Sequence, residues 1–377
     1  GVKTVSKTIG NPLFHWSCLE LKRIFGIDEI LSEKNADEVW NTCNKQLQND
    51  GFGALDILHK WKAEIVCTSD DLTDNLELHK TASGNGGVKV LPSLRGDSIV
   101  AFDGPSSNWM QKLSGNDGAI KNLDDYKQAI TQKLNDFNEA GCKLADHSLD
   151  AGFAFLLPTE SVATILFENY LNDIPLNNRE IVLLKSHLLV FLGTEYCKRG
   201  WVLQLHIGAH RYTSTRLRKL VGPAGGYATI GKTCDIESLC MFLDAMEQQE
   251  LLPRTILYTL NPADNAAFAT LTGSYAEDGV AGKIQFGPAW WYNDQYEGIR
   301  QHLVTLSSYG LLSHFVGMTT DSRSLLSFSR HEYFRRILCN VVGMWVDGGE
   351  LPADNDLISQ LIKDIAYNNS KKFIFNK

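Results

Sequence analysis

The feature that most constrains the fold of this chain is a regular succession of short β-prone runs. Each run is followed by a polar or Gly/Pro-containing loop and then by a helical stretch. Strands that alternate with helices predict parallel βαβ units, and near-continuous apolar strands predict a sheet buried on both faces. Seven such runs occur: KAEIVC (62–67), VKVLP (88–92), GCKLAD (141–146), WVLQLHIG (201–208), TILYTL (255–260), GKIQFG (282–287) and HFVGMTT (314–320).

The side chains that follow these runs decide between a doubly wound sheet and a closed barrel. A doubly wound sheet binds its ligand at one switch point, whereas a barrel brings the ends of all its strands to one face. Polar or aromatic groups follow every run, namely Asp70 and Asp71, Arg95, Asp146 and His147, His206 and Arg211, Asn261, Trp290 to Asp294, and Asp321 and Arg323. This pattern favours an α/β fold of the (β/α)8 TIM-barrel type. Because that barrel needs eight strands, we expect its first strand to be missing from this sequence.

Two further segments predict helices. CLELKRIFGIDEIL and ADEVWNTCNKQLQND, within residues 1–60, have the apolar spacing of amphipathic helices, and we place them between the missing strand and the strand at 62–67. Residues 61–377 would then form the barrel. A helical insertion is expected at about 158–199, where a Pro and a Thr-Glu-Ser group open a periodic apolar segment that ends before Gly200.

Composition excludes several classes of protein. The net charge is −8, with 36 basic and 44 acidic residues, which argues against nucleic-acid binding. No apolar run reaches the length of a membrane span, and the first residues lack the apolar core of a signal peptide. The eight cysteines include no CxxC pair and predict buried thiols in a reducing compartment. We therefore expect a cytoplasmic protein that uses neither nucleic acid nor membrane; a homo-oligomer remains open.

Asp321 and Arg323 stand directly after the last predicted strand. A carboxylate at this place can ligate a metal or carry a proton, and an arginine can hold a carboxylate or an enediolate oxygen with two hydrogen bonds. The competing interpretation is an N-cap, in which Asp321 or Ser322 caps a helix that begins near Ser324. The local sequence favours neither.

The segment HIGAHR (206–211) is a second candidate. His206 lies within an apolar run, where an inward imidazole can bind a metal or polarise a carbonyl; the alternative is a core histidine bonded to a backbone carbonyl. Arg211, together with His210 and Arg216, adds positive charge where an anionic substrate can dock.

Two more segments carry candidate binding residues. In PAWWYND (288–294), Trp290 and Trp291 suit the apolar face of a sugar and Asn293 suits its hydroxyls, although the segment can also be a packed hydrophobic lid. Arg330, in the helix RHEYFRRILC, belongs either to a solvated charged face or to the barrel mouth. HExxH, HxH and CxxC metal motifs are all absent.

Together these segments resemble the uronate isomerase family, the glucuronate isomerases with an amidohydrolase-type barrel. The resemblance covers almost the whole chain. It rests on TIGNPLFHW, LELKRIFGI, ADEVWNTCN, CTSDD, GCKLADHSLD, LQLHIGAHR, LLPRTILYTLNPADN, GKIQFGPAWWYNDQ and the long, specific LLSHFVGMTTDSRSLLSFSRHEYFRRILC. It implies an aldose–ketose isomerase that interconverts D-glucuronate with D-fructuronate, and D-galacturonate with D-tagaturonate. The implied route moves a proton between C2 and C1 through a cis-enediol.

The resemblance also implies roles for single residues. Asp321 would be the aspartate of strand eight, a ligand of a divalent metal (zinc in several relatives) and a participant in proton transfer. Arg323 would stabilise the enediolate, and His206 would face the metal or the substrate. His15 and Trp16 match the segment that closes over the sugar, with Trp16 where some relatives have an aromatic hydroxyl. The family's metal-binding Asp-x-His-x-His motif, on its first strand, is absent here.

Two other functions would suit the same barrel. One is a metal-dependent hydrolase with an activated water and Asp321 as the base. The other is an inactive protein that binds sugar acids. The resemblance favours the isomerase, with a hexuronate as its small-molecule partner.

Overall fold

The computed structural model describes residues 2–83, 87–102, 104–115, 120–150 and 153–375 of the 377-residue chain. Its main sheet has six parallel strands, and their spatial order is their order along the chain. They are β2 (Asp70–Asp71), β4 (Leu94–Arg95), β5 (Leu144–Leu149), β6 (Val202–Ile207), β9 (Thr255–Thr259) and β10 (Ile284–Phe286). Parallel strands laid side by side in chain order form the wall of a (β/α)8 barrel, whereas a doubly wound sheet reverses its order at a switch point.

The first two predicted strands are present, each as a pair of short strands. β1 (Ile65–Cys67) pairs in parallel with β3 (Lys89–Leu91), and the chain continues within three residues into the β2–β4 pair. The next four predicted strands correspond to β5, β6, β9 and β10. A separate antiparallel pair, β7 (Ala209–His210) with β8 (Thr229–Ile230), follows β6.

The prediction of a seventh strand, at residues 314–320, is wrong. Residues 314–320 leave the 3-10 helix η5 (Leu312–His314) and continue as irregular chain, although Phe315 and Val316 are buried as a strand would be. Side chains replace the ladder: the Val316 N–H donates to Gln285 Oε1 (3.2 Å), and Asn369 Nδ2 donates to the Phe315 carbonyl (2.9 Å). Gly317 has φ +81°, and a Cβ there would lie 2.1 Å from the Ile365 carbonyl oxygen. This left-handed turn against the C-terminal helices ends any extended pairing.

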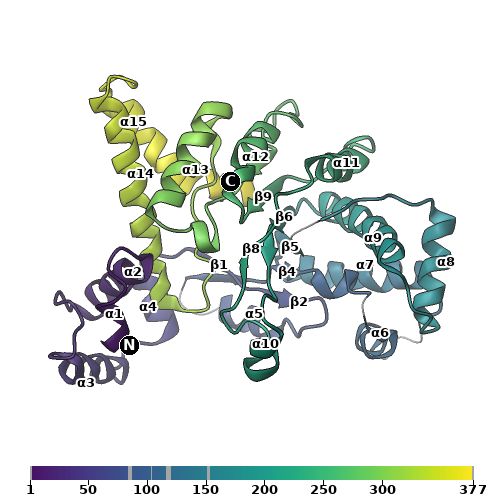
Figure 1. Ribbon diagram of the computed structural model, residues 1–377, viewed down its shortest axis with the longest axis horizontal. Coiled ribbons are helices and arrows are strands. Elements are labelled where there is room, and N and C mark those ends of the chain that lie inside the picture. The colour runs from purple at the N-terminus through teal and green to yellow at the C-terminus, as the bar shows by residue number, and fades with distance from the viewer. Residues whose placement is uncertain (1, 84–86, 103, 116–119, 151–152, 376–377) are drawn as a thin grey trace.

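Helices surround the strands (Figure 1). The longer ones are α6 (Ser106–Ser114), α7 (Leu123–Glu139), α8 (Glu160–Leu171), α9 (Asn178–Lys198), α11 (Ile236–Glu247), α13 (Tyr296–Tyr309), α14 (Ser329–Asp347) and α15 (Asn355–Lys363). The shorter ones are α5 (Glu77–Ser83), α10 (Thr215–Val221), α12 (Asn265–Leu271), α16 (Asn369–Phe375), the 3-10 helices η2 (Asp97–Val100), η3 (Pro262–Asp264), η4 (Trp291–Asn293) and η6 (Leu325–Phe328), and the π-helix η7 (Asp364–Asn368). No helix within the described ranges is long and apolar enough to cross a membrane.

The helical insertion between β5 and β6 shows how local sequence sets these elements. Thr159 caps α8 by accepting a hydrogen bond from the Val162 N–H, and Asn177 with Glu180 forms a capping box at α9. The chain leaves α9 through Gly200, whose φ is +66°. Both helices therefore begin at residues whose side chains cap them, and α9 is followed by a glycine whose backbone freedom suits that position.

The N-terminal helices form a small core of their own. α2 (Pro12–Glu20), the π-helix η1 (Leu21–Phe25), α3 (Ala36–Leu47) and α4 (Ala54–Lys60) follow the short α1 (Val2–Val5). Ile24, Phe25 and Ile57 pack together and against Leu325 and Leu326 of η6. These helices thus support the loop that carries Asp321. That they connect a first barrel strand to β1 stays a prediction.

Candidate functional site

The carboxyl ends of four neighbouring strands bring together a row of side chains, Arg95, Asp146, His206 and Tyr258. Arg95 ends β4, and its Nη1 lies 2.7 Å from Asp146 Oδ2 on β5, while its Nε donates to Asp97 Oδ2 (2.7 Å). His206 on β6 follows, with Nδ1 3.6 Å from the same oxygen of Asp146. Tyr258 on β9 then stacks on His206, with ring centroids 4.8 Å apart. The register explains the row, because His206 pairs with Ser148 on one side and with Tyr258 on the other.

Strand alternation separates Asp146 from its neighbour His147, as expected for adjacent residues on a strand. Asp146 faces Arg95 and His206, whereas His147 faces outward and lies 3.0 Å from the hydroxyl of Tyr196 on α9. Gly96 makes room for this ring, because a Cβ at that position would lie 2.2 Å from His147 Cε1.

Burial controls the charges in this row. It raises the pKa of Asp146 to about 7; Arg95 opposes this effect, and the charges of Asp97 and Asp321 add to it. Burial also lowers the pKa of His206 to about 3, with Arg95 acting in the same direction, so this imidazole is neutral. His206 Nδ1 has no hydrogen-bond partner in the structure. The row therefore contains a carboxyl group that can exchange a proton near neutral pH, beside an uncharged imidazole.

Trp290 connects this row to Asp321. Its indole Nε1 donates to Asp321 Oδ2 (2.9 Å), and its ring centroid lies 4.9 Å from that of His206. Asp321 is exposed and has φ +42°, whereas Trp290 is buried. The N-cap interpretation of Asp321 is wrong, because Ser324 caps η6 and α14 begins only at Ser329. Arg323 is exposed on the same loop.

Arg211 and Trp291 lie beside this row. Arg211 Nε donates to Asp150 Oδ1 (3.0 Å) and Nη2 donates to Ser148 Oγ (2.5 Å), and the guanidinium carbon lies 5.8 Å from the Trp291 ring centroid. Asn293 is turned to the backbone, since its Nδ2 donates to the Leu260 carbonyl (2.9 Å). The structure thus brings Arg211 to the site and engages Asn293 in holding the loop.

The other sequence candidates form a second group, between α2, η4 and α14. His15 Nδ1 lies 3.3 Å from the Tyr333 hydroxyl. Arg330 lies over Trp16, with 4.4 Å between its guanidinium carbon and the ring centroid, and forms an ion pair with the buried Asp294. Burial lowers the pKa of Arg330 to about 10, and Glu20 opposes this effect. Arg330 is therefore part of a packed ion pair and is not a free carboxylate anchor.

Comparison with known proteins shows the family of this chain. The model of the family described as glucuronate isomerase matches residues 2–374. The chain belongs to the glucuronate isomerase family. It is 44% identical over 375 residues to a uronate isomerase of Histophilus somni, covering 98% of this chain and 80% of that protein. It is 42% identical over 376 residues to one of Caldanaerobacter subterraneus, covering 99% and 80%.

A solved structure of the same family has the same fold. The crystal structure of a uronate isomerase from Thermotoga maritima matches with a TM-score of 0.91 and 32% identity, covering 99% of this chain and 81% of that one. The expected membership of an isomerase family is confirmed, and so is the α/β barrel architecture.

The predicted metal ligands of this glucuronate isomerase family member do not form a metal site by themselves. Across the described ranges, no group of three or more His, Cys, Asp or Glu side chains is placed to hold a metal ion. His206 offers an unpaired nitrogen, but the adjacent Asp146 oxygen is paired with Arg95, and Asp321 Oδ2 is bonded to Trp290. These residues do not fit a divalent metal on their own, and the chemistry below uses none.

Sequence reasoning gave no role to several residues of the row. Asp146 and Arg95 were recognised only as polar groups at strand ends, and Asp97 and Tyr258 were not singled out. Tyr258 lies within an apolar run, and only its register with His206 reveals it. The sequence gives a clearer indication for Asp146, since a carboxylate on an otherwise apolar, buried strand requires a partner.

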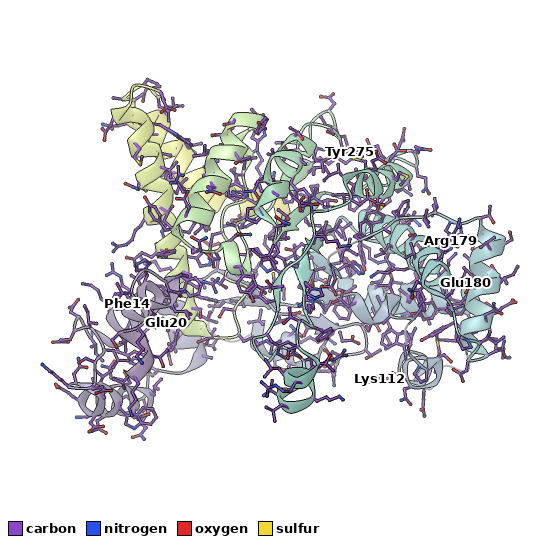
Figure 2. The ribbon with its side chains drawn as sticks, viewed as in Figure 1. Phe14, Glu20, Lys112, Arg179, Glu180 and Tyr275 are labelled. Carbon is purple, nitrogen blue, oxygen red and sulfur yellow. The ribbon has the colours of Figure 1, made fainter. Side chains whose placement is uncertain are left out.

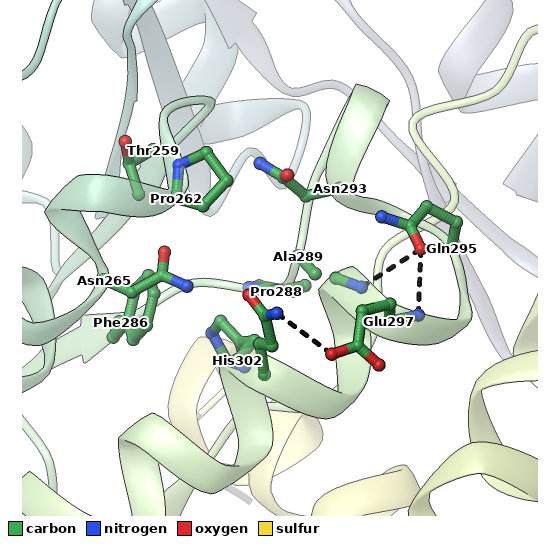
Figure 3. A pocket seen from close by; sticks show the side chains of 12 residues that line it. Thr259, Pro262, Asn265, Phe286, Pro288, Ala289, Asn293, Gln295, Glu297 and His302 are labelled. Atoms are coloured by element: carbon green, nitrogen blue, oxygen red, sulfur yellow. Dashed lines mark hydrogen bonds between the residues drawn. The ribbon is translucent and has the colours of Figure 1, made fainter.

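A cavity of about 150 Å³ lies between the β9–α12 and β10–α13 connections, and no residue of the row lines it (Figure 3). It is lined by Thr259, Pro262, Asn265, Phe286, Pro288, Ala289, Asn293, Gln295, Glu297, Gly298, Gln301 and His302. Of the sequence candidates it contains only Asn293, because it opens between the β9–α12 and β10–α13 connections.

Proposed function

We propose that this chain interconverts D-glucuronate with D-fructuronate, and D-galacturonate with D-tagaturonate, through a cis-enediol. The observation that carries the proposal is the contact chain from Asp146 through His206 and Trp290 to Asp321. This chain of contacts links two carboxyl groups: Asp146 on β5, which is buried with a pKa of about 7, and Asp321, which is exposed on a loop.

The two carboxyl groups divide the proton transfers between them. In the open-chain aldose, Asp321 removes the C2 proton while protonated Asp146 donates its proton to O1, which gives the neutral enediol. Asp321 then returns its proton to C1, and Asp146 recovers a proton from the C2 hydroxyl, which becomes the ketone. Each group ends as it began, and a pKa near 7 suits a group that must give and take a proton at neutral pH.

The remaining residues bind and orient the hexuronate. Arg323 stabilises charge that develops on O1 and O2, and Arg211 holds the C6 carboxylate by two hydrogen bonds. Neutral His206 donates or accepts one hydrogen bond at the reacting oxygens. Trp291 covers an apolar face of the sugar, and the helix that carries His15 and Trp16 closes the site.

Other parts of the proposal concern the protein as a whole. We propose a cytoplasmic location, and we leave the choice between a monomer and a homo-oligomer to solution measurement. The family resemblance implies zinc, with His206 and Asp321 as its ligands. Because these two residues do not fit a divalent metal on their own, the proposed reaction uses no metal.

Proton NMR of D-glucuronate in deuterated water tests the reaction. We expect D-fructuronate that carries deuterium at C1, because Asp321 exchanges its proton with solvent, and we expect no conversion by the D321N variant. Fructuronate without deuterium would support the isomerase activity, but it would indicate a hydride shift, or a proton shielded from solvent, in place of exchange through the enediol. Failure to convert either glucuronate or galacturonate would reject the proposed reaction.

A further inference from the structure

The connection between β6 and α11 is strongly basic in a chain that is acidic overall. Between Glu195 and Asp235 there is no acidic residue, whereas the whole chain has a net charge of −8. We name residues 209–232 the basic insertion; it contains β7, α10 and β8 and follows directly on the strand that carries His206. Its basic residues are Arg211, Arg216, Arg218, Lys219 and Lys232.

Four of the five basic residues of the insertion have no acidic partner among the described residues, and only Arg211 is paired, with Asp150. Arg216, Arg218, Lys219 and Lys232 are exposed, and within the described part of the chain none of them forms an ion pair. Arg218 instead lies over the Tyr212 ring, with 4.0 Å between the guanidinium carbon and the ring centroid. A cation–π contact leaves the positive charge in place.

The arginines of the site itself are mostly neutralised. Arg95 lies against two carboxylates, Arg211 is paired with Asp150, and Arg330 with Asp294. The row described above therefore offers little net positive charge to an approaching anion. The long-range field that attracts a hexuronate has to come from nearby charges without acidic partners.

The insertion is fixed to the site at several points. The Gly231 N–H donates to the Gly208 carbonyl (2.8 Å), and Asn261 Nδ2, at the end of β9, donates to the Gly231 carbonyl (3.0 Å). The Tyr292 hydroxyl, next to Trp291, donates to the Ala228 carbonyl (2.6 Å). Figure 1 shows α10 at the lower edge of the molecule, projecting away from the sheet. The charges are therefore carried by a folded element whose base is attached next to the carboxyl ends of β6 and β9.

We propose that the basic insertion attracts the anionic hexuronate and concentrates it at the site without contacting the reacting atoms. This inference rests on the proposed function and adds a role for Arg216, Arg218 and Lys219. A field from unpaired surface charges raises encounter rates and local substrate concentration, and salt suppresses it.

The test compares kcat/KM for D-glucuronate at ionic strengths of about 10 mM and about 500 mM. The variant is R216Q/R218Q/K219Q; R216E/K219E keeps the Arg218–Tyr212 contact and reverses two charges. The matched control, K112Q/R179Q/K363Q, removes three exposed charges on α6, α9 and α15. Figure 2 labels Lys112 and Arg179 on the right of the molecule, away from α10.

At low salt we expect kcat/KM of the triple variant to fall by about threefold to tenfold with kcat unchanged, and the loss to disappear at high salt. The charge-reversal variant should lose more, and the control should match the unmodified chain. Equal kcat/KM for all proteins, or a loss that persists at high salt, would overturn the proposal. If neither the unmodified chain nor any variant turns over a hexuronate, the proposed function fails. The role of the insertion is then tested by calorimetric affinities of these proteins for D-glucuronate. Affinities that are equal for all of them and independent of salt would overturn that role.

Discussion

Replacing Trp290 with phenylalanine isolates the hydrogen bond that holds Asp321. Phenylalanine keeps an aromatic ring against His206 and removes the indole N–H that donates to Asp321 Oδ2 at 2.9 Å. A hydrogen bond to a charged group contributes about 1.5–3 kcal/mol, or about tenfold to 150-fold in rate where it orients a catalytic group. Because Asp321 is exposed and water can replace part of this bond, we expect the lower end, about tenfold in kcat.

The adjacent tryptophan supplies a matched control for that variant. Trp291 contacts Arg211 and stacks on Tyr292, with centroids 5.1 Å apart, so W291F makes the same chemical change beside the site. We expect W291F to raise KM more than it lowers kcat. Initial rates of both variants are compared with their thermal unfolding, because loss of a buried indole also destabilises the fold by about 1–2 kcal/mol. A folded W290F enzyme with unchanged kcat would refute the argument that Trp290 orients Asp321 for proton transfer.

Three further predictions concern stability and metal content. Because burial raises the pKa of Asp146 to about 7, the folded protein binds more protons than the unfolded protein between about pH 4 and 7. The free energy of unfolding should therefore fall by up to about 4 kcal/mol as the pH rises through this range. Urea titrations at several pH values should show this pH dependence in the unmodified chain and its loss in D146N. R330M leaves the buried carboxylate of Asp294 without its partner and should cost about 3–5 kcal/mol in the same assay, and R330M/D294L should recover part of that loss. Atomic emission spectroscopy should find less than one zinc ion per chain after gel filtration. One equivalent of zinc that only EDTA removes would show that His206 and Asp321 do belong to a metal site.

Strand and helix periodicity predicted the order of the sheet because each buried strand is a local apolar run. β5, β6, β9 and β10 all lie within or beside segments where apolar side chains cluster between polar loops. The same reasoning placed polar residues at one end of the sheet, since parallel strands all end on the same side. What the pattern could not provide was the pairing of those polar groups, because each partner comes from a different strand or helix.

Arg330 and Asp146 illustrate that limit from opposite sides. Arg330 looked like a substrate ligand because arginine suits carboxylates, but the fold supplies a carboxylate of its own from Asp294. Asp146 gave only the signal of a polar residue at a strand end, yet burial raises its pKa to about 7, against the opposing charge of Arg95. Residue type predicted what each group can bind, and tertiary contacts decided what it does bind.

The segment 314–320 fails as a strand for a reason that bears on the chemistry. A strand there would alternate its side chains and present Asp321 at a position set by the pleat. Instead the chain turns at Gly317 and again at Asp321, with φ of +81° and +42°, and side chains of Gln285 and Asn369 satisfy its backbone. A left-handed aspartate is strained, and such strain persists only where surrounding contacts impose it. The bond from Trp290 is one contact that holds Asp321 in this conformation, and this is why the effect of W290F on kcat is the sharpest test of the site.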